Sequence, residues 1–178
     1  MDRRETDVGF ACVSDARALA VMSRDLIEAG VGWAYRPGRM TTLIMDPDAV
    51  VLMARRGRQR VGFAVMSFSD ARAHLALLAV CPTCRRRGIG AGLIEWLLES
   101  CHVAGVTAVD VELRADNGAA YELYRKLGFG ETSRIAGYYA GRETAIRMLR
   151  LLPAQHAGMG EPWRPPTRDG PSATQGLR

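Results

Sequence analysis

The sequence predicts a single mixed α/β domain followed by a short tail, on three observations. First, 48% of the 178 residues are hydrophobic and 24% are charged, the balance of an ordinary globular protein, which excludes disorder, collagen and coiled coil as overall classes. Second, stretches rich in Val, Met and Phe alternate with stretches whose apolar residues recur at helical spacing. Third, this periodicity stops at Pro153. We therefore expect one domain over residues 1–152 and a flexible tail over residues 153–178.

The predicted domain begins with a short strand and two helices. Residues 8–13 are expected to form the strand, and Ser14 to cap the helix that follows, because its hydroxyl can accept a bond from a free amide of the first turn. An apolar stripe identifies this helix, which Gly30 and Gly32 end. A second helix is expected over residues 37–45, with a proline in its first turn.

Three strands and then alternating helices and strands are expected in the rest of the domain. The runs 50–54, 61–68 and 74–80 form a meander, whose first turn contains Gly57. A strongly apolar helix follows over 88–103, then a strand over 107–113 and a helix over 118–127 that Gly128 ends. Residues 129–139 and 144–152 are expected to pair as a closing hairpin. This order of elements is typical of a layered, mixed α/β fold.

The formal net charge is +5 and the isoelectric point about 9.4. Lys126 is the single lysine among 24 basic residues, so the other 23 are arginines. An arginine-rich chain suggests anionic partners such as phosphates, nucleic acid or a membrane surface, although a GC-rich coding bias produces the same composition. The one contiguous triplet is Arg85–Arg87, which favours a local phosphate site over a general polyanion surface.

The cysteines and the N-terminus bear on the compartment. The four cysteines show no regular framework, the first seven residues lack the apolar stretch of a signal peptide, and no apolar run reaches the ~18 residues of a membrane span. We expect a cytoplasmic protein with reduced thiols. Cys81 and Cys84 form a CxxC pair, but one pair without a second is weak evidence for zinc, and no metal is predicted.

A glycine-rich loop is the most informative segment of the sequence. It joins the strand ending at Val80 to the helix beginning near Gly88, and glycines at 88, 90 and 92 allow a ligand close to the main chain. The first amides of a helix have no partners within it, and the helix dipole favours anions there. The loop is thus suited to a pyrophosphate, but the spacing matches neither a Walker loop nor a dinucleotide fingerprint. The alternative is a turn with solvated arginines.

This segment resembles the GNAT superfamily of acetyl-CoA-dependent N-acyltransferases. The family pattern Arg/Gln-x-x-Gly-x-Gly/Ala is met by Arg85, Gly88 and Gly90, after a strand that ends in Val-x-Pro. A second hallmark is met downstream, where Asn117 is followed seven residues later by Tyr124 and then by Leu-Gly-Phe. The resemblance covers roughly residues 7–152.

The resemblance implies a GNAT fold and acetyl-CoA as cosubstrate. The fold would be a mixed, mostly antiparallel central sheet of about seven strands flanked by four helices, with strands 4 and 5 splayed apart to admit the cofactor. Main-chain groups at the end of the fourth strand would bind the pantetheine arm, the loop and first helical turn would hold the pyrophosphate, and an asparagine would bond the cofactor near the cleft. The implied cofactor-binding residues are Leu78, Ala79, Val80, Arg85, Arg86, Arg87, Gly88, Ile89, Gly90, Ala91 and Asn117.

Two residues are the candidates for proton transfer. Acetyl transfer from a thioester needs a base to keep the amine neutral and an acid to protonate the leaving thiolate. By the resemblance Tyr124 is the acid, the alternative being a core tyrosine. Glu112 is the best base, directly or through water, the alternative being a glutamate paired to an arginine on the sheet. His74 is a weaker rival base, and no acyl-cysteine is required.

Within the superfamily the chain looks most like the ribosomal-protein alanine N-acetyltransferases. The matches are 112–117 in the fifth predicted strand, a Tyr-Tyr pair and 141–143, whereas the first 70 residues match much less. A protein N-terminal amine is therefore the first candidate acceptor, and a small-molecule amine the second. A non-catalytic acyl-CoA-binding regulator and a nucleic-acid-binding module are the other classes, and either a monomer or a homodimer is expected. The candidate acceptor-binding residues, which ordinary packing would also explain, are Trp33, Tyr35, Tyr138 and Tyr139.

Overall fold

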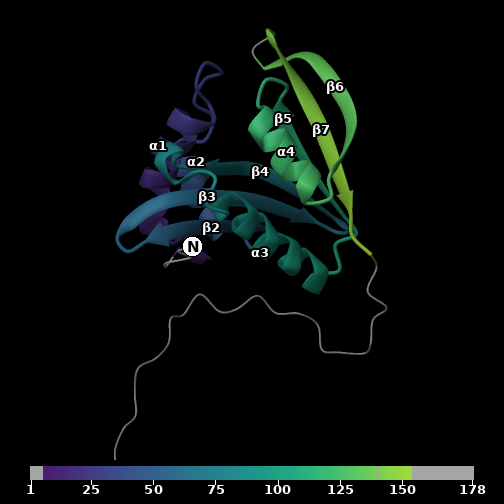
Figure 1. The fold of residues 1–178 in the computed structure, drawn as a ribbon. Helices are drawn as coiled ribbons and strands as arrows, with labels where there is room; N and C mark the ends of the chain where they lie inside the picture. Colours follow the sequence, from purple (N-terminus) through teal and green to yellow (C-terminus); the bar gives the residue numbers. More distant parts are fainter. Residues whose placement is uncertain (1–5, 140, 154–178) are drawn as a thin grey trace, which may run out of the picture.

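A seven-stranded sheet in the order β1-β2-β3-β4-β5-β7-β6 forms the centre of the molecule (Figure 1). The computed structural model describes residues 6–139 and 141–153. The strands are β1 (Asp7–Phe10), β2 (Ala49–Arg56), β3 (Gln59–Ser69), β4 (Arg72–Val80), β5 (Ala108–Arg114), β6 (Gly130–Tyr139) and β7 (Glu143–Leu151), and the α-helices of the described residues are α1 (Ala16–Leu26), α2 (Pro37–Met45), α3 (Ile89–Val103) and α4 (Gly118–Lys126).

The pairing of the strands confirms the predicted fold class. β4 and β5 run parallel, while the other neighbouring pairs of the described sheet are antiparallel. The sheet is therefore mixed and mostly antiparallel, with seven strands and four flanking α-helices in the described part of the chain. The α3 helix provides the long connection that a parallel pair requires.

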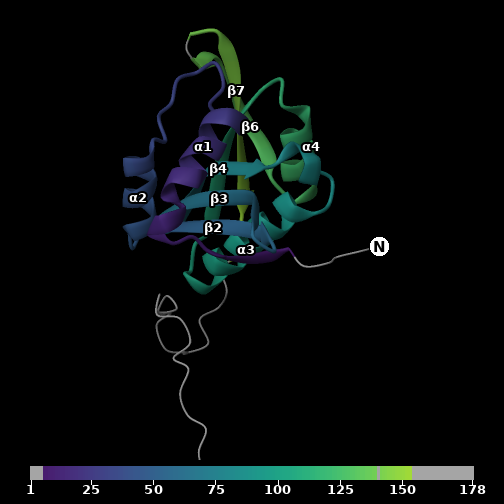
Figure 2. The ribbon, with the colours of Figure 1, turned by 90° about the vertical axis from the view of Figure 1, so that its left-hand side faces the viewer.

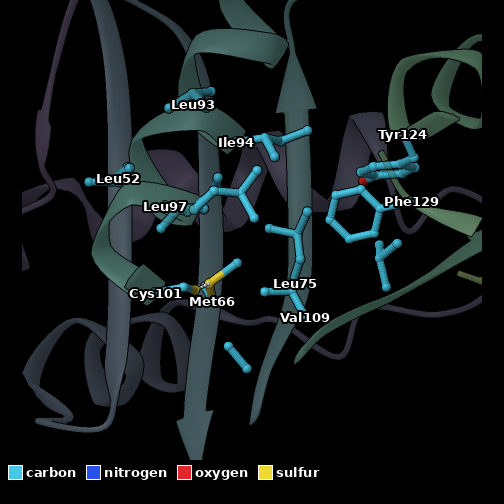
Figure 3. Close-up of a cluster of buried hydrophobic side chains, with 14 of the residues drawn as sticks. Leu52, Met66, Leu75, Leu93, Ile94, Leu97, Cys101, Val109, Tyr124 and Phe129 are labelled. Carbon is cyan, nitrogen blue, oxygen red and sulfur yellow. Dashed lines mark hydrogen bonds between the residues drawn. The ribbon is translucent and has the colours of Figure 1, made fainter. Parts of the chain in front are cut away.

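Two hydrophobic cores lie on opposite faces of this sheet. The larger core packs α3 and α4 against the strands, and Figure 3 shows Leu93, Ile94 and Leu97 of α3 facing side chains of the sheet. The second core packs α1 and α2 against β2, β3 and β4 (Figure 2). Each helix buries one apolar stripe, as the helical spacing in the sequence requires.

The parallel pair β4–β5 parts halfway along its length. Pairing extends from Arg72 with Ala108 to Leu75 with Val111 and then stops, although both strands continue. A bulge in β4 lies at the same place. Leu75 pairs with Met66 and Leu77 pairs with the adjacent Val65, so β4 has one extra residue between them. The extra residue moves the following side chains to the other face of the sheet, so Leu75 lies in the α3 core and Leu77 in the α1–α2 core. The strands are thus splayed, as expected.

The prediction that Ser14 caps the first helix is wrong. Ser14 lies within a 3-10 turn (Val13–Asp15), and α1 begins at Ala16. The side chain that organises this turn is that of Asp15, which accepts hydrogen bonds from the Cys12 amide (3.1 Å) and from Arg55 (2.7 Å) and Arg60 (2.9 Å). A buried carboxylate paired with two arginines of the β2–β3 hairpin therefore ties the start of α1 to the sheet.

Replacing Asp15 by asparagine should destabilise the fold at neutral pH and less so in acid. Burial alone would raise the pKa of Asp15, but hydrogen bonds from Cys12, Arg60 and Arg55 outweigh it and lower the pKa from 3.8 to about 2. The carboxylate thus contributes stability above about pH 4 that is lost as the pH falls toward 2. We expect Asp15→Asn to lower the free energy of unfolding by about 2 kcal/mol at pH 7 and by less at pH 3, measured by urea denaturation.

The matched control is Asp25→Asn, which removes an exposed carboxylate bonded to Arg24 alone. Such surface pairs contribute little to stability because solvent screens them, so this variant should unfold nearly as the parent does at both pH values. Equal losses in the two variants would show that the buried network at Asp15 has no special role.

Some predicted features differ from the structure or lie beyond it. The first strand is shorter than expected, Asp7–Phe10 in place of 8–13, whereas the second helix has the predicted bounds. The tail predicted from Pro153 onward falls, after its first residue, outside the described residues. Within residues 6–139 and 141–153, no helix is long and apolar enough to cross a membrane.

Candidate active site

The loop between β4 and α3 presents unpaired amides at a helix N-terminus. Gly88 is the N-cap of α3 at φ +83°, and no side chain caps the helix. The amide of Gly92 bonds the carbonyl of Gly88 (2.9 Å), so the amides of Ile89, Gly90 and Ala91 precede the first bond of the helix. A helix N-terminus without a capping side chain favours an anion, and phosphate is the usual ligand of such a site.

The three arginines before Gly88 are exposed and take different roles. The Arg85 side chain turns back, and its Nε donates to the carbonyl of Val80 (3.1 Å). Arg86 adopts φ +62°, a left-handed conformation that only this non-glycine residue shows in the described chain. This backbone geometry makes a tight turn immediately before the helix, with the charge of Arg87 beside it.

The main-chain groups of β4 alternate between the β3 side and the open edge. The Cys81 amide donates to Val61 of the β3 side (2.8 Å). Polar groups of every second residue in an antiparallel strand point the same way, so those of Ala79 also face β3, while those of Leu78 and Val80 face the edge from which β5 has parted. Leu78 and Val80 are therefore suitably directed for the pantetheine arm, the Ala79 groups face β3, and binding by any of the three stays a prediction.

Asn117 is the N-cap of α4, and its Oδ1 accepts a bond from the Ala120 amide (3.1 Å). Asn117 is exposed and follows the end of β5 by three residues. Its capping role explains the asparagine at this position, and the amide nitrogen of the side chain is still a donor. A contact with a cofactor remains a prediction.

Glu112 lies on the face of β5 opposite the α3 core, and both of its carboxylate oxygens have partners. Arg147, its cross-strand neighbour on β7, donates through Nε to Oε1 (2.6 Å), and the Tyr138 hydroxyl donates to Oε2. The Glu112 side chain is 20% exposed. Pairing with an arginine on the sheet was the alternative that the sequence left open, and the structure contains that pair.

Tyr124 is buried on α4 against Phe129, in the core shown in Figure 3. Burial, and secondarily the neighbouring Tyr139, raise the pKa of its phenol well above the usual range. The hydroxyl thus keeps its proton at any physiological pH, which is the state that a general acid needs. Among the hydrogen bonds of the described residues, none occupies this hydroxyl.

Tyr138 and Tyr139 pack edge to face at the end of β6, with ring centroids 5.0 Å apart. Hydrogen bonding to Glu112 raises the pKa of Tyr138. Burial first, and then the charge of Glu112, raise the pKa of Tyr139 to about 12. The charge of Glu112 raises the pKa of Tyr139, and Tyr139 contributes to the raised pKa of Tyr124. Tyr139 therefore lies within electrostatic reach of both candidate catalytic groups.

Trp33 and Tyr35 lie in the connection between α1 and α2 and are partly buried against the second core. The indole of Trp33 donates to the carbonyl of Ala20 in α1 (3.2 Å). The guanidinium of Arg39 lies 4.4 Å from the centroid of the Tyr35 ring. These contacts fit the packing alternative for both residues, and their part in acceptor binding stays a prediction.

Three functional candidates were missed by sequence reasoning. Glu28 is 7% exposed and accepts hydrogen bonds from the amides of Ala34 (2.6 Å) and Tyr35 (3.1 Å). Arg114 and Arg147 complete the polar face of β5 and β7. Strand alternation could have placed both arginines on the side of Glu112, but nothing in the sequence indicates the long-range partners of Glu28.

His74 and the CxxC pair are the remaining candidates from the sequence. His74 Nδ1 lies 2.5 Å from Asp110 Oδ2, so the rival base is already paired on the sheet. Cys84 is buried and Cys81 half-buried, and both are free thiols. In the described part of the chain, no group of three or more His, Cys, Asp or Glu residues could hold a metal ion.

The comparisons with known proteins agree with this arrangement. Residues 21–129 match the family model described as "Acetyltransferase (GNAT) family". The [ribosomal protein bS18]-alanine N-acetyltransferase of Escherichia coli is 39% identical over 89 residues, which are 48% of this chain and 60% of that protein. The chain thus spans about 60% of the length of the curated relatives it matches first.

Two solved structures share the fold at low sequence identity. The E. coli ribosomal-protein-S18-alanine N-acetyltransferase has a TM-score of 0.75 at 24% identity, covering 88% of this chain and 100% of the other. The PaiA N-acetyltransferase of Thermoplasma acidophilum, solved in complex with coenzyme A, has a TM-score of 0.72 at 16% identity, covering 83% and 99%. The family model matches more than half of the chain, and the chain therefore belongs to the acetyltransferase (GNAT) family.

Proposed function

We propose that this protein is an N-acetyltransferase that transfers the acetyl group of acetyl-CoA to a primary amine. The observation that supports it best is the parting of β4 and β5 next to the uncapped N-terminus of α3. One end of this opening offers amides for a pyrophosphate. Leu78 and Val80 offer main-chain groups along its edge, and Glu112 of β5 and Tyr139 of β6 belong to the half of the sheet beyond the opening.

Direct attack by the amine accounts for the chemistry with the groups present. Acetyl-CoA supplies the activated thioester, and the amine nitrogen forms the new C–N bond as the C–S bond breaks. Glu112 accepts the proton that the amine loses, directly or through water, and the Tyr124 phenol gives its proton to the thiolate sulfur. A main-chain N–H on the open edge of β4 is suited to stabilise the carbonyl oxygen as it gains charge.

The first candidate acceptor is the N-terminal amine of a protein. Family membership and the likeness to a ribosomal-protein alanine acetyltransferase support it. That likeness covers 89 residues, so a small-molecule amine is the second candidate. We place the reaction in the cytoplasm, where the four free thiols of the chain stay reduced.

One observation favours a second function, that of an acyl-CoA-binding regulator without catalysis. Both oxygens of Glu112 are engaged by Arg147 and Tyr138, so the proposed base is occupied before an acceptor arrives. Release of CoA measured with a panel of peptides and amines decides between the two. If acetyl-CoA binds and no acceptor releases CoA, the regulator is correct.

Gly90→Asp should abolish most of the stabilisation that CoA gives. A Cβ at Gly90 would lie 3.3 Å from Leu123 Cδ2, and a carboxylate there would compete with the pyrophosphate for the amides of the first turn. At one hundred times its Kd, CoA stabilises a folded protein by about 2.7 kcal/mol. We expect a clear rise in the Tm of the parent and little rise in the variant, measured by thermal denaturation.

Gly92→Asp is the matched control for this test. The Gly92 amide is already bonded within the helix, and a Cβ there meets nothing within 4 Å. CoA should stabilise this variant much more than Gly90→Asp. If CoA stabilised Gly90→Asp as much as the parent, the amide cradle would be refuted.

A further inference from the structure

Arg114 joins segments from both sides of the opening. It is the last residue of β5, two positions after Glu112 and on the same face, and its side chain is 23% exposed. One guanidinium nitrogen, Nη2, donates to the carbonyls of Ala29 (2.7 Å) and Ile27 (3.1 Å), which follow α1. Nη1 lies 3.2 Å from Glu143 Oε2 on β7.

The same guanidinium also lies against the aromatic pair of β6. Its carbon is 5.6 Å from the centroid of the Tyr139 ring, within the range of a cation–π contact. Arg114 therefore contacts the α1–α2 connection, β7 and β6 at once. A planar fork with five N–H donors on three nitrogens can reach partners on different sides, whereas the three donors of a lysine ammonium share one nitrogen.

The other hydrogen bonds of the α1–α2 connection, residues 27–36, run within it or to the two helices that it joins, although Trp33 and Tyr35 also pack against the second core. Glu28 accepts hydrogen bonds from the amides of Ala34 and Tyr35 and from the Ser23 hydroxyl. Among the hydrogen bonds of the described residues, those of Arg114 are the ones that link this connection to β5. Gly30 and Gly32 adopt positive φ, so the connection turns tightly on either side of Val31.

We propose that Arg114 is a positioning residue that holds residues 27–36 against the strand carrying Glu112 and so shapes the acceptor side of the cleft. The expected effect on the acceptor KM rests on the proposed function, whereas the expected effect on the order of residues 27–36 does not. The proposed acetyl-CoA contacts lie on β4, at the N-terminus of α3 and at the Asn117 side chain, and the guanidinium of Arg114 bonds none of these. Loss of the guanidinium should therefore weaken acceptor binding while acetyl-CoA binding persists.

The experiment compares Arg114→Met and Arg114→Lys with the parent by hydrogen–deuterium exchange and steady-state kinetics. Because hydrogen bonds to a charged group are stronger than neutral ones, we expect exchange within residues 27–36 to accelerate at least about tenfold in Arg114→Met. The acceptor KM should rise by about tenfold or more, and the acetyl-CoA KM should change less than about twofold. Arg114→Lys should give a smaller change in the same direction.

Arg134→Met is the matched control. Arg134 is an arginine of β6 with a single acidic partner, Glu131, at 2.7 Å, and its side chain is 57% exposed. Its removal should leave the exchange of residues 27–36 and both KM values as in the parent. The hydrogen–deuterium exchange measurement needs no catalysis. It therefore decides the anchoring role even if no acceptor is acetylated and the proposed function is wrong.

Two results would overturn the proposal. One is unchanged exchange in residues 27–36 of Arg114→Met, whether or not an acceptor has been found. The other is faster exchange spread evenly over α3 and β3 in both Arg114→Met and Arg114→Lys, which would show a general structural role. If Arg114→Met does not fold, Arg114→Lys supplies the same two measurements.

Discussion

Glu112→Gln should lower kcat by about a hundredfold or more, because proton transfer by a positioned base contributes about 10²–10⁴-fold. Glutamine keeps the shape of the side chain and can still accept a bond from Arg147 or Tyr138, so the fold should persist. It cannot accept a proton from the amine at neutral pH. The measurement is steady-state CoA release with the best acceptor of the panel, together with the Tm of the variant.

Asp110→Asn provides a matched comparison on the same face of β5. Asp110 lies two residues before Glu112 and pairs with His74 (2.5 Å). We expect this variant to keep its kcat within about threefold, since only the rival base depends on that carboxylate. Full activity in Glu112→Gln with a large loss in Asp110→Asn would move the base to the His74–Asp110 pair.

Tyr124→Phe should also lower kcat by about a hundredfold or more while acetyl-CoA binds as before, because it removes only the acidic proton. The phenylalanine ring can keep the edge contact with Phe129, whose centroid is 5.5 Å away. Burial raises the pKa of Tyr124 above its usual value near 10. The phenol therefore stays protonated up to at least pH 10, and its ionisation should add no alkaline limb to the kcat profile below that pH.

The control for this substitution is Tyr121→Phe, which makes the same change one turn earlier on α4. Its activity should match the parent, because Tyr121 lies toward Glu131 and is only partly buried. A Tyr124→Phe variant with full activity over the whole pH range would exclude the phenol as the acid. Tyr124 would then be the core tyrosine that its burial also allows.

Most of the fold could be predicted because local patterns specify it. The helix Pro37–Met45 was predicted with its bounds, since a proline marks its first turn and an aspartate follows its end. The glycines at 88 and 128 mark the start of α3 and the end of α4 at the expected places. The start of α1 was not predictable in this way, because Asp15 is held by arginines 40 and 45 residues away.

The candidate site was also predictable only where it depends on local spacing. The residue types and spacings of Arg85, Gly88, Asn117 and Tyr124 were enough to indicate the family, which the match over residues 21–129 shows. The pairing of Glu112 with Arg147 depends on the register between β5 and β7, and sequence spacing alone does not specify register.

By itself, then, the sequence determined the element order, the family and the glycine-rich turn before α3, because these depend on short-range spacing, turn residues and helix ends. The tertiary structure decided which groups meet across strands and loops. It alone placed Arg147 and Tyr138 on Glu112 and Arg114 on the carbonyls after α1. The physical reason is that a hydrogen bond between residues 26 to 87 positions apart exists only once the strands have paired and the helices have packed.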